Sequence, residues 1–196
     1  MQPDSAAAAP ASVAVHQTPP PRSALDEELK GQYYGNARPE VFSYLPPQVG
    51  RLLDVGCGHG AFGALVKERL HAEVQGIELY PEVAQVAAGR LDRVHCGDAL
   101  TMLAQTPLAY FDCVTFNDVL EHLVDPAALL RAVRQHLAPG GVVVASLPNV
   151  RHYAVLADLL LRGDWDYADY GVLDRTHLRF FTHKSIRKLF VETGYE

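Results

Sequence analysis

The sequence lacks a long apolar run and a basic leader. No stretch reaches the ~18 apolar residues that cross a bilayer, and the N-terminus has neither the positive start nor the apolar stretch of a secretory signal. We therefore expect no membrane span and a cytoplasmic location.

Cysteine is scarce, and positive charge is not concentrated. Cys57, Cys96 and Cys113 have no zinc-like spacing, and their odd number favours reduced thiols. The formal net charge is −6, with no basic stripe interleaved with aromatic residues. These absences predict no metal site and no nucleic-acid partner.

What is present is an ordinary globular composition. The 196 residues are 48% hydrophobic and 20% charged, which suits a single domain with one core. Residues 1–23 are rich in alanine and proline, with little to bury, so we expect them to be disordered. The domain should cover residues 24–196.

Strand-like and helix-like segments alternate from residue 51 onward, which specifies parallel βαβ units. Apolar segments without polar alternation indicate a sheet covered on both faces, so we predict an α/β, doubly wound, Rossmann-like fold. Asp125 should cap one helix, and Pro139-Gly140-Gly141 should end it. The expected strands are Arg51–Val55, Glu73–Glu78, Arg93–His95, Asp112–Asn117 and Val142–Leu147; the expected helices are Ala61–His71, Pro81–Leu91, a short one near Leu100, Pro126–Leu137 and Lys184–Thr193.

The most informative segment follows the first expected strand and runs from Asp54 to Gly60. Glycines at 56, 58 and 60 allow a sharp turn and close approach of a nucleotide-like ligand to the backbone. Asp54 would repel a pyrophosphate but suits a cation. We therefore interpret the ligand as S-adenosylmethionine (SAM) rather than NAD, although the glycines alone also fit a dinucleotide.

Polar residues end the next strands at the same edge of the sheet. Glu78 ends the second strand, where a carboxylate can accept both ribose hydroxyls. Asp98 follows the third and could accept from the adenine amino group, with the Ala99 amide beside it; a solvated turn is the other interpretation. Asn117 or Asp118 could face the methionine end of the cofactor.

Aromatic and basic residues crowd the connection before the last helix. A covering lid explains them better than a solvated loop, although simple loop packing with Thr182 as a helix cap is the alternative. Within this segment His177 is the best general base, because a neutral imidazole can accept a hydroxyl proton near pH 7. For His122 a structural role is equally expected.

Three segments give the chain a recognisable family likeness: Asp54 to Gly60, Asp118 to Pro126, and Ser146 to His152 continuing at Leu173 to Thr182. The chain resembles class I SAM-dependent methyltransferases, and more narrowly the bacterial group related to ubiquinone-pathway O-methyltransferases and associated with surface-polysaccharide biosynthesis. The resemblance implies that Tyr34 and Arg38 close over SAM.

The resemblance and the motifs together give the expected site. The catalytic residue is His177, and no metal ligand is expected. The cofactor contacts are Tyr34, Arg38, Asp54, Gly56, Cys57, Gly58, Gly60, Glu78, Leu79, Asp98, Ala99, Leu100, Asn117, Asp118, Val119 and His122; the acceptor contacts are Asn149, Trp165, Tyr170, Arg175 and Arg179.

The expected reaction is methyl transfer to a small-molecule acceptor, through an oxygen of a sugar or quinone-like molecule, with S-adenosylhomocysteine as product. The alternatives are a non-catalytic SAM-binding module in polysaccharide assembly and an NAD-dependent oxidoreductase, which Asp54 disfavours. Such folds normally add two strands after the last helix seen here. Without them Val142–Leu147 is an open edge, which predicts a homodimer through that edge, a displaced covering segment or lower stability.

Overall fold

The computed structural model describes residues 35–196. The predicted disordered segment, residues 1–23, and the predicted cofactor contact Tyr34 lie outside the described residues.

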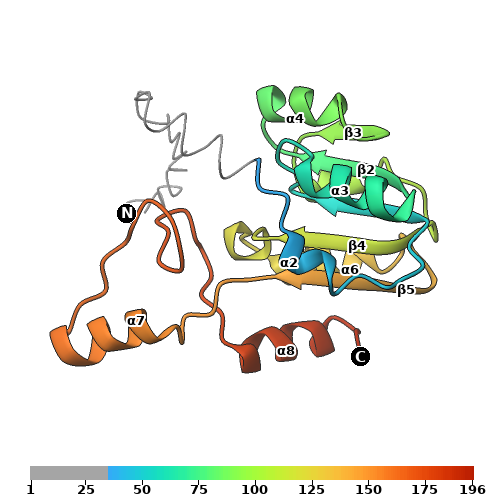
Figure 1. The fold of residues 1–196 in the computed structure, drawn as a ribbon. Helices are drawn as coiled ribbons and strands as arrows, with labels where there is room; N and C mark the ends of the chain where they lie inside the picture. The colour runs from blue at the N-terminus through green and yellow to red at the C-terminus, as the bar shows by residue number, and fades with distance from the viewer. Residues whose placement is uncertain (1–34) are drawn as a thin grey trace, which may run out of the picture.

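A five-stranded, wholly parallel sheet forms the centre of the described structure, in the order β3-β2-β1-β4-β5 (Figure 1). From β1 the chain adds β2 and β3 on one side and then β4 and β5 on the other, so the strand order reverses between β1 and β4. The carboxyl ends of the strands at such a switch point are where a nucleotide-like ligand usually binds. The strands are β1 Arg51–Val55, β2 Glu73–Glu78, β3 Arg93–Cys96, β4 Phe111–Asn117 and β5 Leu137–Ser146.

Helices cover both faces of the sheet, as the apolar strands predicted (Figure 1). Successive residues of β1 point to opposite faces: Leu52 belongs to the core under α2 and α3, whereas Leu53 belongs to the core under α5, α6 and α8. The predicted doubly wound fold is confirmed. The helices are α2 Pro39–Phe42, α3 Ala61–Leu70, α4 Pro81–Ala88, α5 Ala99–Leu103, η1 Leu120–His122, α6 Pro126–Val133, α7 Tyr153–Ala157, η2 Asp158–Arg162 and α8 His183–Glu192.

Several predicted boundaries differ from the structure: α4 ends at Ala88 and not at Leu91, and the largest differences lie at the connection between α6 and β5, since β5 was expected to begin only at Val142. Helix α6 ends at Val133 and not at Leu137, and β5 already begins at Leu137. Pro139-Gly140-Gly141 therefore lies inside the strand, where Gly140 has φ +79° and the pairing with β4 shifts between Phe111 and Cys113. The tripeptide forms a bulge in β5 and does not end the helix.

The predicted caps are confirmed. The amide of Ala128 donates to Asp125 Oδ1 over 2.9 Å at the start of α6. Thr182 and Ser185 form a reciprocal capping box at the start of α8. These side chains fix where each helix leaves the loop that precedes it.

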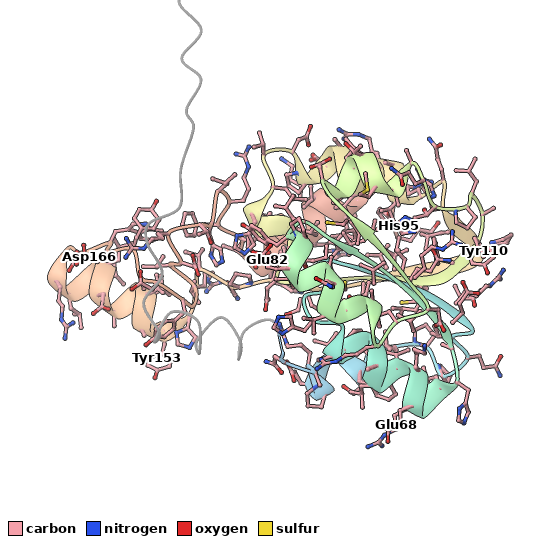
Figure 2. The ribbon with its side chains drawn as sticks, turned by 90° about the horizontal axis from the view of Figure 1, so that it is seen from above. Glu68, Glu82, His95, Tyr110, Tyr153 and Asp166 are labelled. Atoms are coloured by element: carbon pink, nitrogen blue, oxygen red, sulfur yellow. The ribbon has the colours of Figure 1, made fainter. Side chains whose placement is uncertain are left out.

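Residues 147–182 leave the sheet as an arm that carries α7 and η2 away from the sheet (Figure 1). In Figure 2, Tyr153 and Asp166 lie on this arm at one end of the molecule and Tyr110 lies at the other. The arm returns to the body where Asn149 bridges Phe181. Among residues 35–196, no helix is both long and apolar enough to cross a bilayer.

Candidate cofactor and acceptor site

The glycine loop joins β1 to α3 at the switch point of the sheet. Gly56, Gly58 and Gly60 have φ values of +71°, +54° and +75°, which side chains rarely adopt. The amide of Gly56 donates to the Ile77 carbonyl over 2.8 Å, so the loop is tied to β2. A Cβ at Gly56 would overlap Val119, which packs directly against the loop.

Glu78 lies beside this loop at the carboxyl end of β2 and is almost fully buried. Its Oε2 accepts from the Gly58 amide and its Oε1 from the Tyr80 amide, each over 3.0 Å. A carboxylate oxygen can accept more than one hydrogen bond, so Glu78 can also accept from a vicinal diol. The predicted ribose contact fits this position.

Asp54 is 1% exposed at the end of β1. Thr115 Oγ1 donates to its Oδ1 over 2.7 Å and Asn117 Nδ2 over 3.4 Å. Burial raises the pKa of Asp54 to about 7, and the hydrogen bond from Thr115 only partly offsets this. A ligand with a positive charge would restore the ionised form.

Asn117 adds an unused acceptor to this corner of the site. Its Oδ1 is buried without a hydrogen-bond partner, although its Nδ2 is engaged by Asp54. A buried acceptor without a donor is costly, so this oxygen suits a ligand N–H. The predicted contact between Asn117 and the methionine end of SAM would give this oxygen the donor that it lacks.

Two apolar residues, one after β2 and one at the start of α5, are exposed, and the Asp98 carboxylate that caps α5 lies between them in sequence. Leu79 and Leu100 are 56% and 47% exposed where they follow β2 and begin α5. A planar base between them would cover apolar area that water now contacts. Asp98 caps α5 by accepting from the Thr101 amide over 3.0 Å, and Ala99 follows it.

Arg38 and Asp118 are paired with each other instead of lying free at the switch point of the sheet. Arg38 Nη1 contacts Asp118, and Arg38 Nη2 donates to Ser146 Oγ over 2.8 Å. This arginine therefore joins the start of α2 to the carboxyl ends of β4 and β5. Both residues lie near these strand ends, but their charges already have partners.

Cys57 and His122 were predicted cofactor contacts and have other surroundings. Cys57 is buried behind the glycine loop, where burial raises the pKa of its thiol far above the usual range. His122 packs edge-on against His177 with ring centroids 4.8 Å apart, and its Nδ1 lies 3.3 Å from the Thr176 carbonyl oxygen. His122 thus belongs to a cluster with the predicted base.

The predicted base His177 is buried where the returning arm docks on η1. Its Nδ1 lies 3.1 Å from the Val172 carbonyl oxygen and its Nε2 lies 4.0 Å from Glu121 Oε1. Glu121 is fully buried, neither carboxylate oxygen has a hydrogen-bond partner, and burial raises its pKa to about 8. Glu121 is not among the predicted site residues, because its only signal in the sequence is that an acid stands next to His122.

The predicted acceptor contacts divide into two groups. Trp165 packs against Phe180 with centroids 5.4 Å apart, so it lies near His177 within the aromatic part of the arm. The others have local partners or solvent: Asn149 accepts from the Arg151 amide, Arg175 pairs with Asp169, Arg179 donates to the Val124 carbonyl and Tyr170 is 73% exposed.

Comparison with known proteins identifies the family of the chain. A family model described as a methyltransferase domain matches residues 25–196. The chain is 33% identical over 161 residues to the ubiquinone biosynthesis O-methyltransferase of Psychrobacter arcticus, covering 74% of this chain and 58% of that protein. It is 35% identical over 146 residues to the protein of the same name from Xanthomonas axonopodis pv. citri, covering 66% of this chain and 60% of that protein.

The fold comparison points the same way. A crystal structure of a SAM-dependent methyltransferase from Archaeoglobus fulgidus superposes with a TM-score of 0.68 at 22% identity, over 87% of this chain and 74% of that one. The fold is that of class I SAM-dependent methyltransferases. The chain belongs to the family of methyltransferase domains, because the family model matches most of its length. It spans less than two thirds of the curated relatives described above.

Proposed function

We propose that this chain transfers the methyl group of SAM to an oxygen of a small aromatic acceptor and releases S-adenosylhomocysteine. The observation that carries the proposal is the set of groups at the switch point of the sheet, where the glycine loop and two buried carboxylates, Asp54 and Glu78, lie at the carboxyl ends of the neighbouring strands β1 and β2. Two acids at neighbouring strand ends suit a cationic nucleoside and disfavour the pyrophosphate of NAD.

A hydroxyl on an aromatic ring is the acceptor that the arm suits best. Trp165 and Tyr167 each pack against Phe180, with ring centroids 5.4 and 6.1 Å from that of Phe180, and the His177 ring lies 6.3 Å from the same ring. Aromatic side chains pack favourably against a planar ring and exclude water around it. The curated relatives named above are ubiquinone biosynthesis O-methyltransferases, which supports an aromatic oxygen over a sugar oxygen.

The reaction needs little from the protein beyond alignment and one proton transfer. The acceptor oxygen forms its bond to the methyl carbon as the carbon–sulfur bond breaks, and that electron pair neutralises the sulfonium. The hydroxyl proton goes to His177 Nε2, because the Val172 carbonyl accepts from Nδ1–H and leaves the lone pair on Nε2. Holding the reactants in line supplies most of the acceleration.

The test is transfer of a deuterated methyl from labelled SAM to a panel of catechols, phenols and free sugars, followed by mass spectrometry. We expect a trideuteromethyl ether on a phenolic oxygen. His177→Ala should lower turnover by about 10² with nearly unchanged SAM affinity, whereas His152→Ala, an exposed histidine on the same arm, should keep full turnover. Label on a sugar but on no phenol would overturn the acceptor assignment.

Two further parts of the proposal concern the setting of the reaction. Cys57, Cys96 and Cys113 are all free thiols, which favours the reducing cytoplasm. We also infer that two copies associate through β5, which pairs only with β4 within the described residues. Tight SAM binding without transfer to any acceptor would favour the alternative of a non-catalytic SAM-binding module.

A further inference from the structure

The Glu121 side chain has no evident structural reason to be where it is. It is fully buried at η1, and neither Oε1 nor Oε2 has a hydrogen-bond partner. A buried carboxyl group without partners costs several times what a typical hydrogen bond contributes. Its main-chain carbonyl, by contrast, accepts from the amides of Leu178 and Arg179 over 2.9 and 3.0 Å. These hydrogen bonds fix the main chain of Glu121, whereas its carboxylate makes no hydrogen bond.

Two histidines lie next to this carboxylate, and each has its Nδ1 beside a main-chain carbonyl. His177 Nδ1 lies 3.1 Å from the Val172 carbonyl oxygen. His122 Nδ1 lies 3.3 Å from the Thr176 carbonyl oxygen and 3.2 Å from Thr176 Oγ1, and that hydroxyl donates its own proton to Asp174 Oδ1 over 2.6 Å, so both Thr176 oxygens can accept from Nδ1–H. Such a contact fixes the tautomer and leaves the Nε2 lone pair available. The same arrangement is usual for histidines that bind metal ions, whose second nitrogen donates to a carbonyl or carboxylate.

The three side chains converge from two segments distant in sequence. Glu121 and His122 lie on η1, and His177 comes from the returning arm, whose main chain is hydrogen-bonded to η1. One ligand atom from each residue lies within 4.8 Å of the other two, and His177 Nε2 is 4.0 Å from Glu121 Oε1. That last separation is too long for a direct hydrogen bond.

We propose that Glu121, His122 and His177 bind one divalent transition-metal ion. Ligands about 2.1 Å from a tetrahedral Zn²⁺ lie about 3.4 Å apart, so side-chain shifts of about an ångström would close the site. Two imidazoles and one carboxylate are a ligand set for Zn²⁺ or Fe²⁺ that leaves coordination positions open. His122 is half-buried, so the ion could reach solvent or an acceptor on that side.

A role for this ion in the reaction rests on the proposed function. An acceptor hydroxyl bound at the open position would lose its proton to water more readily, because a divalent ion lowers the pKa of an oxygen that it binds. His177 would then serve as a ligand and not as the free base. Removal of the ion with a chelator distinguishes the two roles of His177. It should abolish turnover if His177 is a metal ligand and leave turnover unchanged if His177 is the free base.

The test uses the whole chain, stripped with a chelator and dialysed. Titration with Zn²⁺ in a calorimeter and with Co²⁺ under visible spectroscopy should show one saturable site per chain, with Co²⁺ absorption bands typical of nitrogen and oxygen ligands. Zn²⁺ should also raise the melting temperature, because an ion bound only by the folded state stabilises it. Absence of saturable binding by either ion would overturn the inference.

Variants locate the site. Glu121→Gln and His122→Ala should each weaken Co²⁺ and Zn²⁺ by about 100-fold or more, since loss of even an outer-shell partner costs 10- to 100-fold. His152→Ala should bind as the parent does. His122 is half-buried, so its variant should fold even if Glu121→Gln does not. Parent-like affinity in His122→Ala, or equal loss in His152→Ala, would place any bound ion elsewhere.

The site and the proposed reaction can fail separately. Full methyl transfer in a metal-free protein would refute the role of the ion while leaving methyl transfer standing. Stoichiometric Co²⁺ binding that His122→Ala abolishes, with no transfer to any acceptor, would support the site and refute the reaction.

Discussion

At the scale of single residues, Glu78 has two tasks. Its two oxygens accept from the amides of Gly58 and Tyr80, so it shapes the loop, and we propose that it also accepts from the ribose of the cofactor. Hydrogen bonds to a charged acceptor contribute more than neutral ones, at about 1.5 to 3 kcal/mol each. Loss of the charge should therefore weaken both the loop and the ligand.

We expect Glu78→Gln to weaken SAM at least tenfold, the equivalent of about 1.4 kcal/mol. Glu73→Gln is the matched control, because Glu73 begins the same strand, at the end opposite Glu78. Calorimetric titration of the two variants and the parent measures the effect. Equal affinities in all three proteins would remove Glu78 from the cofactor site.

Asp54 should make SAM binding depend on pH. Its pKa is raised to about 7, so below that value the unliganded protein holds a proton there, and a cationic ligand must displace it. Affinity attributable to Asp54 is therefore complete above about pH 7 and falls as pH decreases, by at most about tenfold per unit.

The comparison of parent with Asp54→Asn isolates this effect from the titration of SAM itself. We expect the ratio of the two dissociation constants to grow between pH 5.5 and 7.5 and then to level off. Calorimetry in buffers of matched ionic strength measures it. A ratio that stays constant over this range would show that Asp54 does not change its charge when SAM binds.

At this scale the sequence predicted which side chains gather at the carboxyl ends of the strands better than it predicted the contacts of the arm. Asp54 and Glu78 lie at the carboxyl ends of strands and the glycines follow directly, so their place at one edge of a parallel sheet follows from the fold class alone. Glu121 and His177 meet only because the arm folds back onto η1, and no short-range pattern encodes that contact. The pairing of Arg38 with Asp118 was unpredictable for the same reason.

At the scale of elements, the loop after β1 and the loop after β4 are interlocked. Gly56 needs φ +71°, and Val119 occupies the space that a Cβ would take. Gly163 offers a matched comparison, because its φ is +68° but the space around it is open. Substitution by alanine should therefore cost only the backbone penalty at Gly163, and both the backbone penalty and a steric clash at Gly56.

We expect Gly163→Ala to lower the free energy of unfolding by about 1 to 2 kcal/mol, the backbone penalty alone. Gly56→Ala should lower it by about 2 to 5 kcal/mol, because overlap with Val119 adds about 1 to 3 kcal/mol, and should also weaken SAM at least tenfold by displacing the loop. Urea unfolding and calorimetry measure these values. Equal stability losses would mean that the Val119 contact is readily relieved.

The elements themselves were predictable, with one instructive exception. Strands β1 and β2 match their predicted bounds because apolar runs end at charged or glycine residues. The end of α6 was misplaced because Pro139-Gly140-Gly141 reads locally as a helix terminator. In the folded chain these residues instead bend β5 where the carbonyl of Phe111 approaches Gly141.

At the scale of the whole molecule, β5 is one of the two edge strands of the described sheet, and β3 is the other. A groove of about 560 Å³ follows it between α2 and α8, and consecutive residues Val143–Leu147 line the groove, so it runs along the strand edge. Val142, at 36% exposure, is among the apolar side chains at this edge. Unpaired main-chain groups on an apolar strand favour pairing with another strand.

We expect this chain to associate into dimers in sedimentation experiments at micromolar concentrations, and Val142→Lys to shift it toward monomer, since a charge on an edge strand opposes pairing. Val86→Lys, at a similarly exposed valine on α4, is the control and should leave the dimer intact. A parent chain that stays monomeric throughout would refute association through β5.

The central claim is that two buried acids and a glycine loop form a site for a cationic nucleoside. Calorimetric titration of the chain with SAM, S-adenosylhomocysteine and NAD under one set of conditions tests it most directly. The account predicts one site for SAM and for its demethylated product, with Kd of about 1 to 100 μM, or roughly −8 to −5.5 kcal/mol, and no comparable binding of NAD. Binding of NAD that is tighter than that of SAM would contradict it.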